Sequence, residues 1–217
     1  MIFGDEKEIK QSVSATSYGM ESQTFIFTGR SGVGKGTQAA LLETYLKKKD
    51  PGRKVLSFAS GDGLREYIKG THYSNRRAKE IYDTGGLFPE FLAVYNWAHF
   101  FTEHMEGDEH LLLDGLPRKL CEAQILDGAF DFYKHKRVFI LWMEGSREWS
   151  TKLLSGRGRS DDTPENIVSR LDWYDEEVAP TIEYFRAHPR HTFLEINAEQ
   201  SIADVHNEIV KKIEEVA

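Results

Sequence analysis

The sequence predicts an α/β fold in which five parallel strands form a central sheet with helices on both of its faces. Two observations support this prediction. Short apolar runs alternate along the chain with longer segments of helical periodicity, and this alternation is typical of parallel sheets joined by crossover helices. The length of 217 residues also suits one domain with excursions better than two full domains.

The predicted strands are short runs rich in β-branched and aromatic residues. They cover residues 24–28, 55–59, 110–113, 137–142 and 192–196. The predicted helices cover about 35–49, a mostly helical stretch at 61–105, 119–133, 146–154, a long helix starting at residue 164, and 202–215. Pro51 ends the first of these helices, and Pro164 suits the first turn of the long one, with Asp162 or Thr163 as its cap.

Composition excludes several classes of protein. A net charge of −7 disfavours a general nucleic-acid binder. The single cysteine, Cys121, permits neither an intrachain disulfide nor a cysteine-based metal site, and we expect it to be a small buried residue of its helix. We see neither a secretory signal nor a membrane span, so we expect a cytoplasmic protein. Residues 1–23 are polar and are predicted to form a flexible arm before a single domain at 24–217.

A glycine-rich turn joins the first predicted strand to the first predicted helix, with the sequence Gly29-Arg30-Ser31-Gly32-Val33-Gly34-Lys35-Gly36-Thr37-Gln38. Glycines let successive backbone N–H groups converge on phosphate oxygens, and the helix N-terminus adds partial positive charge. Lys35 supplies a cation for the β- and γ-phosphates, and Thr37 a hydroxyl for a magnesium shell. The alternative is a β–α turn that binds nothing.

This turn departs from the strict phosphate-loop pattern because Gly36 separates Lys35 from Thr37. In this form it resembles the loop of the adenylate kinase family, and the likeness extends over about 24–213. The resemblance implies a P-loop kinase fold with an acceptor-binding helical excursion at about 61–105 and a short lid at about 155–163. It also implies a monomeric, magnesium-dependent enzyme that transfers a phosphoryl group from ATP to a nucleoside monophosphate, with no nucleic-acid or membrane partner.

Two further motifs carry the resemblance to the acceptor side. The segment from Ser60 to Arg65 resembles T-G-D-x-L-R, which gives Ser60 and Arg65 contacts to the acceptor nucleotide. Asp62 is either a helix N-cap or a ligand residue. The segment 113–118 resembles L-D-G-F-P-R, so Asp114 is expected to hold the water shell of magnesium and Arg118 to bind the acceptor phosphate. The family's cis bond is expected at Leu116–Pro117.

The arginine-rich segment 156–162, followed by Arg170, resembles the family's lid. Arg159 and Arg170 would clamp the transferred group, Arg157 would help on the donor phosphates, and Asp161 and Asp162 would orient these arginines. The absence of a Cys or His quartet in this segment predicts the zinc-free kind of lid.

Three residues depart from the family pattern and leave the acceptor base open. Glu122 stands where adenylate kinases carry a Gln that reads the adenine edge, and a carboxylate can only accept hydrogen bonds. Lys152 stands where many short-lid relatives have an Arg packed on the donor base, and Gly63 replaces a larger apolar residue. AMP is the expected acceptor, with CMP, UMP or GMP as alternatives.

The resemblance therefore assigns a complete set of site residues. The catalytic residues are Lys35, Arg118, Arg159 and Arg170; the ATP-binding residues are Gly29, Gly32, Val33, Gly34, Lys35, Gly36, Thr37, Lys152 and Arg157; the acceptor-binding residues are Ser60, Arg65, Gly115, Arg118, Glu122, Arg159 and Arg170; and the magnesium residues, acting largely through water, are Thr37 and Asp114. No histidine is needed as a base, and we interpret all eight as surface or core residues.

Two other classes of function are less well supported by the sequence. An NTPase switch would need base-specific loops such as N-K-x-D, and none follows the fourth predicted strand. A nucleotide-binding module without catalysis would not require Lys35, Asp114, Arg118, Arg159 and Arg170 together.

Overall fold

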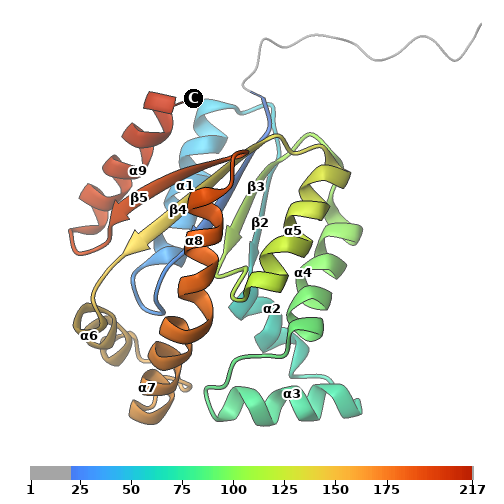
Figure 1. The fold of residues 1–217 in the computed structure, drawn as a ribbon, viewed down its shortest axis with the longest axis vertical. Coiled ribbons are helices and arrows are strands. Elements are labelled where there is room, and N and C mark those ends of the chain that lie inside the picture. The colour runs from blue at the N-terminus through green and yellow to red at the C-terminus, as the bar shows by residue number, and fades with distance from the viewer. Residues whose placement is uncertain (1–20, 217) are drawn as a thin grey trace, which may run out of the picture.

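The structure is a computed structural model, and it describes residues 21–216. Most of the predicted N-terminal arm, residues 1–20, lies outside the described residues, so that expectation stays a prediction. The strands of the described chain are β1 (Gln23–Thr28), β2 (Val55–Ala59), β3 (His110–Asp114), β4 (Arg137–Glu144) and β5 (His191–Asn197). They form one five-stranded sheet in the order β2-β3-β1-β4-β5 with parallel pairing throughout, which confirms the predicted fold class (Figure 1).

The helices follow the predicted positions with two differences. They are α1 (Lys35–Lys49), α2 (Ser60–Tyr67), α3 (Tyr73–Asp83), α4 (Glu90–His104), α5 (Leu120–Tyr133), α6 (Arg147–Arg157), α7 (Pro164–Trp173), α8 (Ala179–Ala187) and α9 (Ile202–Val216). First, α6 continues through residue 157, into the segment expected to be a lid loop. Second, the long helix is divided by a π-helical turn at Tyr174–Val178, which separates α7 from α8.

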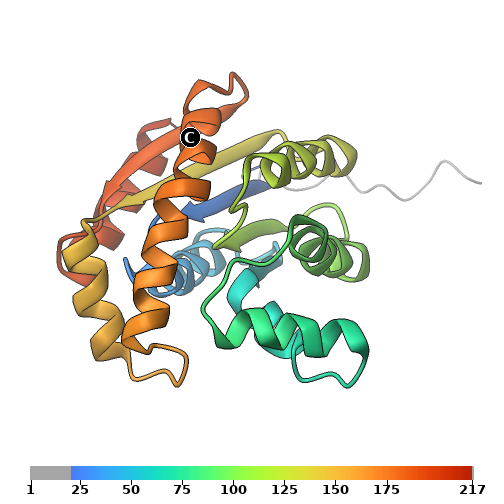
Figure 2. The same ribbon diagram turned by 60° about the horizontal axis from the view of Figure 1, so that its bottom comes forward.

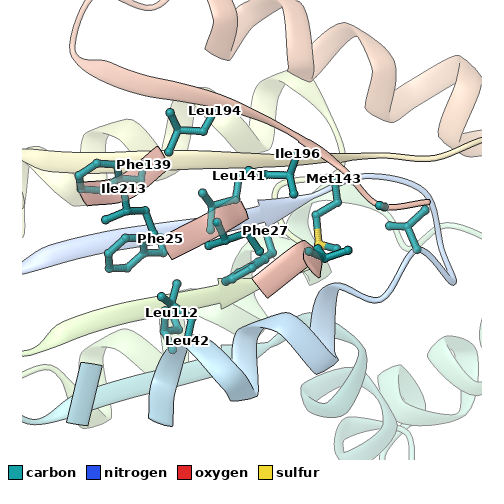
Figure 3. Packing of buried hydrophobic residues seen from close by; sticks show 14 of the residues in the cluster. Phe25, Phe27, Leu42, Leu112, Phe139, Leu141, Met143, Leu194, Ile196 and Ile213 are labelled. Atoms are coloured by element: carbon teal, nitrogen blue, oxygen red, sulfur yellow. The ribbon is translucent and has the colours of Figure 1, made fainter. Parts of the chain in front are cut away.

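Different helices cover the two faces of the sheet. Successive strand residues point to opposite faces, so each strand contributes to both clusters. On one face, Phe25 and Phe27 of β1 pack with residues of α1 and α9, among them Leu42 and Ile213 (Figure 3). On the other face, Ile26 packs in a second cluster with residues of α4, α5 and α8. Within β1 and β4, the rings of Phe25 and Phe139 stack with centroids 5.0 Å apart. Both faces are thus buried, as continuous apolar strands require.

The polar segments expected to bind nucleotides follow the carboxyl ends of the strands. The glycine-rich turn follows β1, α2 follows β2, and Asp114 ends β3. Because the strands are parallel, all these ends meet at one edge of the sheet. The helices α2 and α3 stand on one side of this edge and α6 and α7 on the other (Figure 2).

Several local expectations can be compared with the structure. The bond Leu116–Pro117 is cis, as expected, and Thr163 caps α7 by accepting a hydrogen bond from the Asn166 N–H. The N-cap of α2 is Ala59, so the interpretation of Asp62 as a cap is wrong. Cys121 is exposed rather than buried. The buried face of α5 carries positions 122, 123, 126, 127 and 130, and Cys121 lies outside it.

No helix among residues 21–216 is long and apolar enough to cross a membrane.

Candidate active site

The glycine-rich loop is shaped by three left-handed glycines, Gly29, Gly32 and Gly34, with φ of 138°, 90° and 96°. Close packing adds to this requirement at two of them. A Cβ at Gly29 would lie 2.4 Å from the Met143 carbonyl oxygen, and one at Gly32 would lie 2.7 Å from the Leu154 Cγ. Other residues would be strained at these φ values, so the loop can take this path only with glycine.

Lys35 folds back over this loop. Its Nζ donates hydrogen bonds to the carbonyl oxygens of Gly29 at 2.8 Å and Arg30 at 2.7 Å. Burial lowers the pKa of Lys35 to about 8; the nearby Asp114 opposes this shift, whereas Arg118 and Arg157 reinforce it. The ammonium is therefore buried beside one carboxylate and two other cations, and an added anion would stabilise its charged form.

The part of the cleft that is expected to bind the acceptor, called here the acceptor side, is organised around Arg118. Its guanidinium donates to the Gly115 carbonyl at 2.9 Å and to the Ser60 Oγ at 3.1 Å, and it lies 5.4 Å from the centre of the Trp173 ring. Ser60 in turn donates to the Gly115 carbonyl at 2.6 Å. Burial lowers the pKa of Arg118. These partners are neutral and fix the fork without occupying it with a carboxylate.

The lid arginines are held differently, by ion pairs. Arg157 binds Asp162 through two hydrogen bonds of 2.7 and 2.6 Å. Arg170 contacts Asp162 at 2.9 Å and also pairs with Asp161. The side chain of Asp162 is 2% exposed, so this carboxylate is the buried centre of the cluster. The predicted role of the two aspartates in orienting the arginines agrees with these contacts, although the role itself remains a prediction.

One cleft of about 1320 Å³ joins the loop, the acceptor side and the lid. Of the predicted site residues it is lined by Gly29, Gly32, Val33, Gly34, Lys35, Gly36, Thr37, Ser60, Arg65, Asp114, Gly115, Arg118, Arg157, Arg159, Asp161 and Arg170. Lys152 does not line it; this exposed lysine lies 5.9 Å from the Trp149 ring centre, and Trp149 and Leu153 line the cleft instead. Glu122 lines a small adjoining pocket.

Comparison with known proteins assigns this arrangement to a family. The family model described as "Adenylate kinase" matches residues 27–190. The chain is 31% identical to "Adenylate kinase 1" of Nostoc sp. over 85% of its own length and 95% of the relative's. It is also 30% identical to an "Adenylate kinase" of Prochlorococcus marinus, over 85% and 94%, and to one of Corynebacterium urealyticum, over 83% and 93%.

The chain belongs to the adenylate kinase family. Members of this family are phosphotransferases, and the chain is therefore a nucleoside monophosphate kinase by membership. The loop, the acceptor-side arginine and the lid arginines described above occupy one cleft, as a family that brings two nucleotides together requires.

The residues expected to hold magnesium fit a hard cation that prefers oxygen ligands. Asp114 and Thr37 both line the cleft. A Cβ at Gly36 would lie 3.1 Å from the Asp114 Oδ2, which places this carboxylate against the first turn of α1. Burial raises the pKa of Asp114, while the positive charges of Lys35 and Arg118 oppose the shift. A divalent cation would stabilise the ionised carboxylate in the same way.

Glu122, the residue that replaces the family's base-reading Gln, is buried. It is 3% exposed, and its Oε2 accepts a hydrogen bond of 2.7 Å from the Arg118 backbone N–H. Burial raises the pKa of Glu122, while the Arg118 N–H opposes the shift. Glu122 therefore anchors the backbone of the acceptor-side arginine besides facing the small pocket.

Two side-chain contacts beside the site were missed by the sequence analysis. Asn96 of α4 lines the pocket beside Glu122 and fills the space that a side chain at Gly63 would take, because a Cβ there would lie 2.8 Å from its amide. Arg30 of the loop pairs with Asp175 of the π-helical turn and lies 4.6 Å from the centre of the Tyr174 ring. The unusual Gly63 was the only sequence signal for Asn96, and nothing signalled the Arg30 contact.

Proposed function

We propose that this protein is an adenylate kinase that transfers the terminal phosphoryl group of ATP to AMP, reversibly and with Mg²⁺. The observation that carries the proposal is the single cleft lined by Lys35 of the phosphate loop, Arg118 of the acceptor side and Arg159 and Arg170 of the lid. Such cations on three sides of one cleft suit a phosphoryl group that passes between two bound nucleotides.

Each group of residues has a distinct task in this proposal. The loop N–H groups and Lys35 bind the donor phosphates, with Arg157 helping. Arg118 and Arg65 bind and orient the acceptor phosphate, and Ser60 and Gly115 position Arg118. Arg159 and Arg170 neutralise the charge that spreads over the transferred group, a contribution of about 3–7 kcal/mol to the barrier for one charge clamp.

Magnesium, held through Thr37 and Asp114, would neutralise charge on the donor phosphates. The remaining work is done by the chain. The lid at about 155–163 would have to close over the cleft to exclude water, because otherwise water would compete with the acceptor for the phosphoryl group. The helical region of about 61–105 would hold the acceptor nucleotide.

The acceptor base is the part of the proposal that depends on the fewest residues. A carboxylate at Glu122 can accept a hydrogen bond from an amino group of adenine, cytosine or guanine or from the ring N3–H of uracil, but it cannot donate to a ring nitrogen unless it is protonated. CMP, UMP and GMP therefore remain alternatives. A cytoplasmic location and a monomeric state also remain predictions.

An acceptor panel tests the proposal. The protein is mixed with MgATP and, separately, AMP, CMP, UMP, GMP or dAMP, and diphosphate products are quantified by chromatography. We expect ADP formation from AMP to exceed all other transfers. Preference for another base would rename the substrate, whereas no transfer from folded protein would contradict the kinase assignment and favour a binding module or a switch.

The variant Glu122→Gln sharpens this panel. If Glu122 reads the base, the variant changes the ratio of kcat/KM values between acceptors. If it only anchors the Arg118 N–H, the variant lowers all of them in parallel, because the amide oxygen can still accept that hydrogen bond but more weakly.

A further inference from the structure

A second cluster of chemically active side chains lies far from the cleft. Asp127 of α5, His188 directly after α8 and His191 at the start of β5 converge so that one ligand atom from each lies within 4.8 Å of the others. Figure 1 shows α5 and α8 side by side over the sheet. The strand β5 is seven residues long and runs from this cluster toward the sheet edge where the carboxyl ends of the strands meet. At ~3.3 Å per residue, about 20 Å separates the cluster from that edge.

The separations between the ligand atoms of this cluster are compatible with a bound metal ion. His191 Nε2 lies 3.0 Å from Asp127 Oδ1, and His188 Nε2 lies 3.4 Å from Asp127 Oδ2. Ligand atoms around a tetrahedral zinc with bonds of about 2.0–2.1 Å are separated by about 3.3 Å. The two imidazole rings stack at 4.1 Å, which directs both Nε2 atoms to the same carboxylate.

The protein satisfies this cluster only in part. Asp127 Oδ2 accepts a hydrogen bond from the Tyr184 hydroxyl, whereas Asp127 Oδ1 is buried and has no aligned hydrogen-bond partner within residues 21–216. The side chains of Asp127 and His191 are only 8% and 3% exposed. Buried polar atoms are normally paired, and an ion held by Oδ1 and the two Nε2 atoms would give this oxygen a partner.

We propose that Asp127, His188 and His191 form a binding site for a divalent first-row transition metal, with zinc the best fit. Two imidazole nitrogens and one carboxylate oxygen are ligands that suit zinc and its neighbours, whereas magnesium prefers oxygen ligands only. Three protein ligands leave a coordination position open for water. The ion would join α5 to the turn between α8 and β5 and stabilise the fold there, independently of the proposed kinase reaction.

Zinc binding by the untagged full chain tests the proposal. The protein is stripped with a chelator and titrated with Zn²⁺ by calorimetry in the presence of excess Mg²⁺ and ADP, which occupy the nucleotide cleft. We expect one equivalent to bind. At a hundredfold excess over Kd, zinc should raise Tm by ~5–10 °C. The double variant His188→Gln/His191→Gln should bind at least a hundredfold more weakly, whereas His104→Gln, which changes an exposed histidine of α4, should bind like wild type.

A second measurement keeps the test decisive if the double variant does not fold. X-ray absorption of the zinc-loaded wild-type chain should show two imidazole nitrogens and oxygen ligands. No zinc binding in excess of magnesium, unchanged zinc affinity in a folded double variant, or a zinc shell without imidazole would each overturn the proposal.

Discussion

The phosphate loop and the lid supply cations to the same cleft, but they hold these cations in opposite ways. Lys35 is hydrogen-bonded to two backbone carbonyl oxygens of its own loop, and the loop takes its shape from glycines with positive φ. Arg157 and Arg170 of the lid are instead paired with Asp162, and Arg170 also pairs with Asp161. Lys35 is thus held by backbone carbonyl oxygens, whereas Arg157 and Arg170 are held by carboxylates that an anionic ligand could replace.

This difference separates binding from closure. A lysine whose pKa is lowered to about 8 by burial is stabilised directly when phosphate oxygens replace its carbonyl partners. An arginine in an ion pair gains less from an anion, because it must leave or share its carboxylate first. We therefore expect the loop to determine how ATP binds, and the lid arginines to contribute mainly in the transition state, when charge develops on the transferred group.

The largest effect is expected from removing the loop cation. Lys35→Ala should lower kcat/KM about 10³-fold or more, because one charge clamp contributes two to five powers of ten. Arg118→Ala should cost a similar factor on the acceptor side. Steady-state kinetics with MgATP and AMP measures both, and circular dichroism checks the fold. The control is Lys47→Ala, an exposed lysine on the same helix. Either variant keeping more than about a tenth of wild-type turnover would remove the assigned role.

A smaller effect is expected from the lid, and it should appear in kcat. Arg170→Ala should lower kcat about 10²-fold with little change in the KM for ATP. Asp162→Asn should lower it by less, about 3- to 10-fold, because it weakens two ion pairs without removing a cation. Arg77→Ala, an exposed arginine on α3, is the control. A rise in KM without loss of kcat would show that the lid arginines act in ground-state binding, as the loop does.

The pH dependence of kcat/KM should follow the charge of Lys35 in the loop. The pKa of Lys35 is lowered to about 8 from 10.5, so the free enzyme loses this charge as pH rises through about 8. The value of kcat/KM for MgATP should then fall up to tenfold per pH unit above 8, whereas kcat should stay level to higher pH because bound phosphate raises the pKa of Lys35. An initial-rate profile from pH 6.5 to 10 measures both, and a kcat/KM that is flat to pH 9.5 would contradict it.

The same shift has the opposite sign for stability. Between pH 8 and 10.5 the unfolded chain binds the Lys35 proton and the folded chain does not. The contribution of this residue to the free energy of unfolding therefore rises with pH over that range and is level below it. Urea unfolding at pH 7.5 and 9.5 measures this effect. Between these pH values, the free energy of unfolding of wild type should increase relative to that of Lys35→Ala.

The contrast also explains which parts of the site could be predicted from the sequence. The loop is contiguous, and its glycines, Lys35 and Thr37 express a local backbone requirement that a short motif records. Asp114 and Arg118 likewise belong to one short segment at the end of a strand. Strand positions were predicted closely because the strands of a parallel sheet are buried on both faces and therefore appear in the sequence as continuous apolar runs.

Contacts between distant segments could not be predicted in this way. The amide of Asn96 fills the space above Gly63, and Glu122 bonds the Arg118 N–H instead of simply facing a base. The π-helical turn that carries Asp175 toward Arg30 has no local signature. Asp127, whose carboxylate lies close to the histidines at 188 and 191, is on α5 and far from both in the sequence, so no local pattern joined the three residues. Each of these depends on how packed elements meet, which one sequence does not specify locally.

The smallest effect should come from the residue that distinguishes this loop from the strict pattern. A Cβ at Gly36 would lie 3.1 Å from the Asp114 Oδ2 and, apart from its chain neighbours and the backbone of its own helix, would meet no other atom within 4 Å. Gly36 is absent from the positions with positive φ, so Gly36→Ala should cause no backbone strain and should displace only the Asp114 carboxylate by a few tenths of an ångström. We expect kcat to fall about 2- to 5-fold and the Mg²⁺ concentration for half-maximal rate to rise by a similar factor, because a carboxylate aligned through water tolerates a small shift.

Titrating Mg²⁺ at fixed ATP measures the effect of Gly36→Ala. The contrasting variant is Gly29→Ala, which should fail to fold stably because its Cβ would meet backbone at 2.4 Å. A loss of kcat in Gly36→Ala as large as that in Lys35→Ala would mean that the contact between the start of α1 and Asp114 of β3 matters as much as the conformation of the loop backbone.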